Sequence, residues 1–152
     1  MSDHHIVFIP ADPHYLPTEQ QVSSAKAALW QWMPVAEAVD AAVAEYVKFH
    51  DCGSNFEYVR CQVCGQELTI PQWHLLMEQD YDLERGFGLT SQTLPCCGNV
   101  ASVNQLDYSF MQGFSRFSLT AINPRTGAMS AQQTELLQRE LGHPLLVIYC
   151  HV

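Results

Sequence analysis

The middle of the chain contains two short cysteine segments, Cys61-Gln-Val-Cys64-Gly65 and Thr93-Leu-Pro-Cys96-Cys97-Gly98. Each segment ends in a Cys-Gly pair, and glycine in that position lets backbone amides approach the sulfur atom before it. A Cys-x-x-Cys spacing is typical of metal sites and of redox centres. The fold of residues 52–110 therefore depends on what these four sulfur atoms form.

Length and composition favour a single domain over residues 1–152. Apolar residues make up 47% and charged residues 15% of the chain, a globular composition. No run approaches the about 20 apolar residues that span a bilayer, so we expect no membrane partner. Residues 1–10 lack the cationic start and the cleavage site of a secretory signal. We therefore expect a cytoplasmic protein, in which thiols stay reduced and disulfides are the minority outcome.

A structural zinc ion, Zn²⁺, is the favoured interpretation of the four sulfur atoms. One ion would account for all four residues, and the first segment matches a zinc knuckle, in which two cysteines lie on a tight turn. A thioredoxin-like pair is less favoured because Cys61 does not open a helix after a strand, and a second sulfur pair would have no role. An iron–sulfur cluster, disulfides and plain buried thiols remain open. A catalytic zinc would require water in place of one sulfur.

The second segment departs from an ordinary knuckle, which would place a cysteine at position 94. The chain has Leu94 there and supplies Cys96 instead. Adjacent side chains start out pointing apart, so Cys96 and Cys97 reach one ion only if the backbone kinks, which Pro95 and Gly98 permit. The expected metal ligands are four cysteines, with two other residues as alternatives for the fourth: Cys61, Cys64, Cys97 and Cys96, then His74 and Cys52.

The segments on either side of the cysteines repeat one order, strand, helix, strand. Strands are indicated by β-branched or alternating apolar residues, and helices by capping boxes that begin at Thr18 and Ser130. We predict an α+β fold, a ferredoxin-like (βαβ-βαβ) sandwich interrupted by a zinc-ribbon-like insertion at 52–110, although an unrelated α+β arrangement also fits. The expected strands are 4–9, 43–49, 114–122 and 145–150, the expected helices end at Pro34 and Gly142, and residues 35–42 are ambiguous.

The insertion is acidic and has little apolar material of its own. Its expected helix begins at Thr69 and offers a small apolar face (Trp73, Leu76, Met77 and Tyr81), so we expect a metal to staple it. Its charge disfavours phosphate backbones and favours cationic partners. Carboxylates at 78, 80, 82 and 84 form either a solvated rim or an interface for a basic protein. The eight carboxylates of residues 51–110 are Asp51, Glu57, Glu67, Glu78, Asp80, Asp82, Glu84 and Asp107, against Arg60 and Arg85.

The TLPCCG stretch and the later Gly113-Phe-Ser-Arg-Phe117 resemble small, largely uncharacterised bacterial proteins that carry a zinc ribbon. This resemblance covers roughly residues 50–123 and implies that two knuckles at the tips of short hairpins share one tetrahedral ion. Small acidic bacterial proteins of this design often serve as immunity proteins, which occlude the active site of a basic toxin. By this analogy we expect a non-enzymatic protein that binds and neutralises a basic bacterial toxin.

Two other classes of function stay open. A zinc-ribbon protein associated with nucleic acid or transcription would need a basic stripe interleaved with aromatic residues, which the insertion does not supply. An enzyme would have to use His14, His50 or the sulfur site, because no Ser/His/Asp order, HExxH, P-loop or GxGxxG is present. Cys150 lies in the apolar last strand, where we expect a buried thiol.

Overall fold

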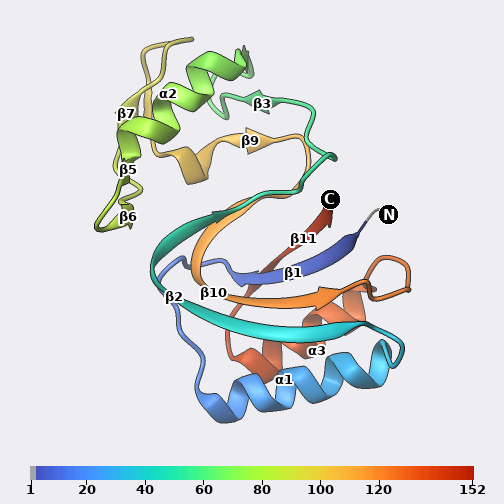
Figure 1. Cartoon of the computed structure of the whole chain (residues 1–152). Helices are drawn as coiled ribbons and strands as arrows, with labels where there is room; N and C mark the ends of the chain where they lie inside the picture. Colours follow the sequence, from blue (N-terminus) through green and yellow to red (C-terminus); the bar gives the residue numbers. More distant parts are fainter. Residues whose placement is uncertain (1–2) are drawn as a thin grey trace.

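The computed structural model describes residues 3–152, and Met1 and Ser2, which begin the segment expected to lack a secretory signal, lie outside the described residues (Figure 1). Its largest sheet has six strands in the order β11-β1-β10-β2-β6-β5, and the four long strands pair antiparallel. The predicted α+β class is confirmed. The elements of this main body are β1 (His4–Pro10), α1 (Glu19–Trp32), β2 (Ala38–His50), β10 (Gly113–Ile122), α3 (Ala131–Leu141) and β11 (Leu145–His151).

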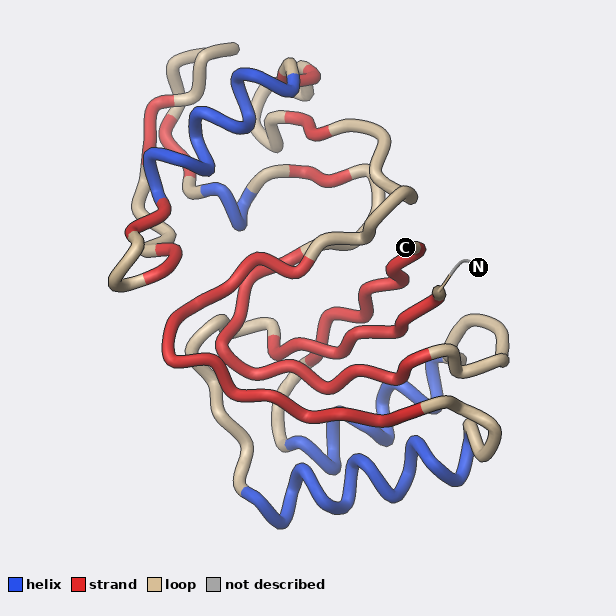
Figure 2. The backbone as a smooth tube through the Cα atoms, viewed as in Figure 1, coloured by secondary structure: helices blue, strands red, loops and turns tan. Residues whose placement is uncertain are grey.

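Both helices of the main body, α1 and α3, cover the same face of the sheet (Figures 1 and 2). Their apolar stripes meet the sheet in one buried cluster that includes Phe8, Leu29, Phe117, Leu119 and Leu137. Burial of side chains of this size contributes about 1.5–3 kcal/mol each. None of the helices in the described part of the chain has the length and apolar character that a bilayer crossing requires.

The predicted capping boxes are confirmed at both helices. The Gln21 amide donates to the Thr18 hydroxyl at 3.2 Å, and the Thr18 amide donates to the Gln21 side chain at 2.8 Å. Ser130 and Gln133 repeat this pair of bonds before α3. These reciprocal bonds satisfy two of the N–H groups that a helix start leaves free, which is why the sequence pattern located both helices.

β2 begins five residues before the strand start predicted at residue 43. Its first part, from Ala38, pairs with β10 in the register Ala38↔Ile122 to Val43↔Phe117. The alanine-rich stretch shows no clear alternation because most of its side chains are exposed. Pairing with β10 therefore decides the strand state of residues 38–42, and local pattern does not.

β2 and β10 continue beyond the helices and carry the insertion. Between Ser115 and Phe117 the register slips, so that residues 44–47 of β2 stand opposite a single residue of β10. The side chain of that residue, Arg116, fills the irregularity and donates to the Ala44 carbonyl at 3.0 Å. A bulge of this kind bends the strands, and the bend directs both away from the helices (Figure 2).

The insertion consists of short strands around one helix. Two sheets of two-residue strands, β4-β3-β9 and β7-β8, stand beside α2, and a hairpin of β5 and β6 follows α2. The expected helix is confirmed, with the Thr69–Gln72 capping box in place. The bounds are β3 (Val59–Arg60), β4 (Glu67–Leu68), α2 (Ile70–Asp80), β5 (Tyr81–Asp82), β6 (Gly86–Phe87), β7 (Gln92–Thr93), β8 (Val100–Ala101), the 3₁₀ helix η1 (Val103–Gln105) and β9 (Asp107–Tyr108).

The apolar core of the insertion is larger than the helix face alone provides. Trp73 lies at its centre, with its ring stacked on Phe56 at 5.3 Å between centroids and edge-on to Phe49 and Tyr108. Phe49 comes from β2, and the buried Phe114 comes from β10. By sequence both strands belong to the main body, so the apolar side chains that they contribute to the insertion were not predicted.

The insertion is fastened to the main sheet at two places. Gly86 of β6 pairs in parallel with Val47 of β2, and at its φ of +70° a Cβ would lie 2.6 Å from the Tyr46 Cβ. At the other end, the Ser54 amide donates to the His151 carbonyl of β11 at 2.8 Å. These contacts place the insertion beside the sheet and leave its tip with the cysteines away from the helices (Figure 1).

Candidate metal centre

The first cysteine pair lies on the turn between β3 and β4. The Cys61 amide donates to the Gln66 carbonyl, and the Gly65 amide donates to the Cys61 carbonyl, both at 2.9 Å. Gly65 has a φ of +76°, a conformation in which side chains are rarely found. The closed turn directs the amides of Val63 and Cys64 to the Cys61 sulfur, at 3.3 and 3.5 Å. These are the bonds expected of a metal knuckle.

The second cysteine pair lies on a turn with the same backbone bonds, between β7 and β8. The Leu94 amide donates to the Asn99 carbonyl at 2.8 Å, and the Gly98 amide donates to the Leu94 carbonyl at 3.0 Å. Gly98 has a φ of +74°. Every position is 33 residues further along the chain, since 94 replaces 61 and 98 replaces 65. The two turns are therefore built alike.

The matching turns explain the departure at position 94. Leu94 stands where the first turn has Cys61, and its side chain is 2% exposed and belongs to the insertion core. Cys97 matches Cys64. Cys96 takes the place of Val63, so the second turn supplies its two sulfur atoms from neighbouring residues. The kink expected around Pro95 and Gly98 is thus the same turn as in the first segment, with one cysteine at a different position.

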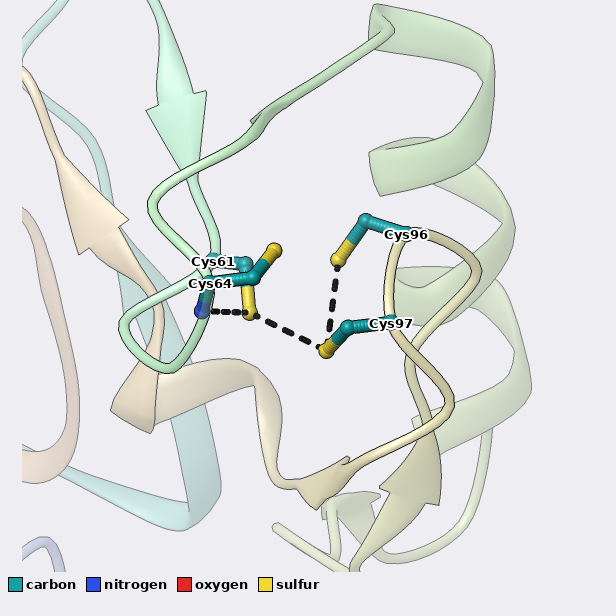
Figure 3. Close-up of side chains that lie close together, drawn as sticks. All are labelled: Cys61, Cys64, Cys96 and Cys97. Carbon is teal, nitrogen blue, oxygen red and sulfur yellow. Dashed lines mark hydrogen bonds between the residues drawn. The ribbon is translucent and has the colours of Figure 1, made fainter.

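The four cysteine side chains converge between the two turns (Figure 3). The sulfur atoms of Cys61, Cys64, Cys96 and Cys97 all lie within 4.8 Å of one another. Cys97 lies 3.8 Å from Cys61 and 3.8 Å from Cys96. A tetrahedron of sulfur atoms around Zn²⁺ at about 2.3 Å has edges of about 3.8 Å, whereas a disulfide bond measures about 2.05 Å. All four are free thiols in a group that could hold a metal ion.

The electrostatics of the four thiols also fit a cation. Amide donation, first from Cys64 and then from Val63, lowers the pKa of the Cys61 thiol to about 6. Burial raises the pKa of the Cys96 thiol to about 12, with smaller contributions from hydrogen bonds to the neighbouring thiols and from repulsion by the charge at Cys61. A dication would remove this repulsion and release the remaining thiol protons on binding.

Asn99 contacts the sulfur group but was not predicted from the sequence. The side-chain amide of Asn99 donates to the Cys97 sulfur at 3.2 Å, a bond that supports the ligand from outside the group. Asn99 follows the Cys-Gly pair, as Gln66 does in the first turn. That shared position was the available signal, but a polar residue after a turn is too common to single out.

The two alternative ligands lie elsewhere. Cys52 is buried at the end of β2, where burial raises the pKa of its thiol to about 11 and its amide donates to Gln112. His74 is exposed on α2, with its ring 5.3 Å from the Trp73 ring. Neither belongs to the sulfur group within the described residues.

The candidate catalytic histidines do not gather at one place with the cysteines. His14 is exposed, and its amide donates to Asp12 within a loop. His50 lies where β2 leaves the main body, and burial lowers its pKa. Cys150 in β11 is intermediate between buried and exposed, so the expected buried thiol is only partly buried.

One carboxylate of the expected acidic rim has a structural role. Asp80 is 6% exposed, and its carboxylate accepts from the amides of Leu89 and Thr90, both at 2.8 Å, and from the Thr90 hydroxyl. Leu89 has a positive φ of 54°. Asp80 therefore holds the chain between β6 and β7, which leads to the second knuckle.

A group of four thiolates leaves no position for water when all four bind one tetrahedral ion. Such a centre stabilises a fold and does not activate substrate. The four cysteines bring together segments that are distant in sequence, since Cys61 and Cys64 follow β3 while Cys96 and Cys97 follow β7.

No protein-family model, curated protein or solved structure matches the chain.

Proposed function

We propose that Cys61, Cys64, Cys96 and Cys97 hold one structural Zn²⁺. The observation that carries this proposal is the spacing of the sulfur atoms, since Cys97 lies 3.8 Å from both Cys61 and Cys96, the edge length of a zinc–thiolate tetrahedron. The separation is too long for a disulfide. Backbone amides of the first turn donate to the Cys61 sulfur, and the Asn99 side chain donates to the Cys97 sulfur, as thiolates require. Elemental analysis of the purified protein is expected to find about one zinc per chain.

The arrangement also favours a ferredoxin-like body with a zinc-ribbon-like insertion. In order along the chain, the four long strands are β1, β2, β10 and β11, and they stand in the sheet as β11-β1-β10-β2. Both connecting helices cover one face, which agrees with a βαβ-βαβ sandwich. Each cysteine turn joins two short antiparallel strands, β3 to β4 and β7 to β8, as the knuckles of a zinc ribbon do.

The role proposed for the protein is to bind a cationic protein through the acidic insertion. The insertion has two arginines and no lysine. One of them, Arg60, lies over the Tyr58 ring at 4.0 Å, and the other is Arg85. Seven of the eight carboxylates are exposed, Asp80 being the buried one. A surface with this imbalance attracts basic proteins and repels phosphate backbones. The exposed carboxylates are Asp51, Glu57, Glu67, Glu78, Asp82, Glu84 and Asp107.

The specific form of this role that we propose is an immunity protein of the cytoplasm, which binds and neutralises a basic bacterial toxin. The acidic surface supports it because enzymes that act on nucleic acids carry basic active sites, and an acidic partner can occlude them. A closed thiolate centre and dispersed histidines give no support to an enzyme. The excess of carboxylates gives no support to a nucleic-acid-binding ribbon.

The test is affinity capture from the native cell with variants matched for charge. The zinc-loaded protein is expected to retain a protein of high isoelectric point that is released as salt rises. Glu78→Gln with Glu84→Gln in the insertion should weaken this capture, and Glu135→Gln with Glu140→Gln on α3 should not. Asp82 is left intact because its carboxylate accepts from the Glu84 and Arg85 amides and shapes the turn. Equal capture by both variants, or capture of nucleic acid alone, would contradict the proposed role.

A further inference from the structure

The main sheet has an open edge along β2. The outer side of this strand meets another strand only where Val47 pairs with Gly86, so the edge from Ala38 to Tyr46 has no partner among residues 3–152. The middle of this edge is apolar and exposed, and Val43 is 59% exposed. An edge of this length presents unpaired N–H and C=O groups that another strand can join.

A hollow of about 350 Å³ runs beside this edge, between β2 and the first two turns of α1. Figure 1 shows α1 below β2 at the same margin of the sheet. The helix contributes one stripe of side chains to the hollow, and the strand contributes three successive residues. The stripe is Glu19, Val22, Ser23 and Lys26, the strand residues are Ala41, Ala42 and Val43, and Pro17 and Phe117 complete the lining.

The helix stripe is complementary to itself. Glu19 and Lys26 lie at its ends, seven residues apart, with Val22 and Ser23 between them. If a second α1 packs antiparallel about the point between Val22 and Ser23, each Glu19 meets the partner's Lys26 at both ends of the contact. Among residues 3–152 the only ion pair joins Glu135 and Arg139. Glu19 and Lys26 therefore have no charged partner among these residues.

The strand residues fit the same two-fold symmetry. When two copies of β2 pair antiparallel about Ala42, Ala41 stands opposite the partner's Val43, and Asp40 stands opposite the partner's Ala44. No like charges face each other in this register, and small apolar side chains meet at the centre. Ala42, at the centre of the strand register, lines the same hollow as Val22 and Ser23, at the centre of the helix stripe. One two-fold axis can therefore relate both the two strands and the two helices.

We propose that this edge binds a second copy of the chain and forms a symmetric dimer with a continuous sheet across β2. A surface that pairs with its own copy must match itself under a two-fold rotation. The β2 edge meets this condition in its strand register, and the α1 stripe meets it through Glu19 and Lys26. The hollow beside the edge is also balanced in charge, with Glu19 against Lys26, within a chain of net charge −9. The proposal is independent of the function proposed for the insertion.

The first test is the molar mass in solution, measured by light scattering or sedimentation across a range of concentrations. The expected mass is about 34 kDa, twice the 17.1 kDa of one chain. Val43→Lys places a charge at the centre of the edge and is expected to raise the dimer Kd by more than about tenfold. Val100→Lys is the control, because Val100 is similarly exposed, at 61%, but lies in the insertion. A monomer throughout, or equal effects of both variants, would overturn the proposal.

The second test is a charge exchange, which does not depend on disrupting the strand. Glu19→Lys and Lys26→Glu each place like charges opposite one another in the antiparallel contact, so each alone should weaken the dimer. The double variant Glu19→Lys/Lys26→Glu restores opposite charges and should recover the dimer, with circular dichroism confirming the fold of all three. A dimer insensitive to the single reversals, or a double variant that stays monomeric, would overturn the two-fold arrangement.

Discussion

Leu94 marks the difference between two cysteine turns that otherwise share the same backbone hydrogen bonds. The first turn uses its leading position for a ligand, Cys61, and the second uses it for a core side chain. The ligand then moves to Cys96, two residues along, while the turn and its closing glycine stay the same. A cysteine at 94 should therefore point where the Cys61 side chain points, toward the ion.

This symmetry predicts the outcome of moving the ligand back. Cys96→Ala removes a thiolate and should weaken zinc binding by more than the ~10–100-fold that loss of a supporting partner costs. Leu94→Cys together with Cys96→Ala should recover most of this loss, because four thiolates again surround the ion. Competition with a colorimetric chelator measures the affinities. If the double variant binds zinc no better than Cys96→Ala, the two turns are not equivalent.

The buried position of His50 leads to a prediction of how the stability of the main body depends on pH. Burial lowers its pKa from 6.5, and a bond to the Ser115 backbone opposes this only in part. The folded protein therefore holds His50 neutral, while the unfolded chain takes up a proton as the pH falls below 6.5. Stability that is present above pH 6.5 is lost below it. Urea unfolding at several pH values should show this slope, and His50→Gln should reduce it more than the exposed-site control His14→Gln. An unchanged slope would contradict the neutral, buried state.

At the scale of elements, Gly86 is the contact between the β5–β6 hairpin and the main sheet. Replacement by alanine would place a Cβ 2.6 Å from the Tyr46 Cβ and 2.7 Å from the Val47 carbonyl oxygen, at a φ of +70°. The hairpin would have to move away from β2.

We expect Gly86→Ala to lower the free energy of unfolding by about 2–4 kcal/mol, since backbone strain and a steric clash add. Gly65→Ala is a matched control, because Gly65 has a similar φ of +76° but no atom within 4 Å of an added Cβ. It should cost only the ~1–2 kcal/mol of the left-handed conformation. Chemical denaturation at saturating zinc measures both. Equal losses would show that the approach to Tyr46 is unimportant.

The elements also show which parts of the fold a sequence reveals. The capping boxes at Thr18, Thr69 and Ser130 and the alternation of β10 are local, and all were predictable. The strands of the insertion have two residues each and carry no period. The start of β2 depends on pairing with β10. The clustering of the four cysteines was predictable because cysteine spacing is a chemical signal, whereas the bond from Asn99 and the structural role of Asp80 depend on contacts made only after folding.

At the scale of the whole molecule, the two apolar clusters differ in what holds them. The main body packs two helices on a sheet, with Phe8 and Leu119 fully buried. The insertion packs around Trp73, with Leu76 and Val103 among its buried partners, and its two cysteine turns meet at the sulfur group. Structural zinc contributes on the order of 10 kcal/mol to a small fold, much of what such an insertion needs.

Removal of zinc should therefore loosen the insertion before the main body. With a chelator present, amide hydrogen exchange is expected to rise at β3, β4, β7 and β8, while β1, β10 and β11 stay protected. Restoring zinc should reverse the change. Equal loss of protection in both parts would mean that they unfold together, and no change in the insertion would mean that the ion is not structural.

The central claim is that four thiolates from two matching turns hold one zinc ion. The most direct measurement is zinc-edge X-ray absorption of the purified protein. The spectrum should show four sulfur ligands at about 2.3 Å and no nitrogen or oxygen ligand. A spectrum with fewer sulfur ligands, with histidine nitrogen in the first shell, or with no bound zinc would contradict it.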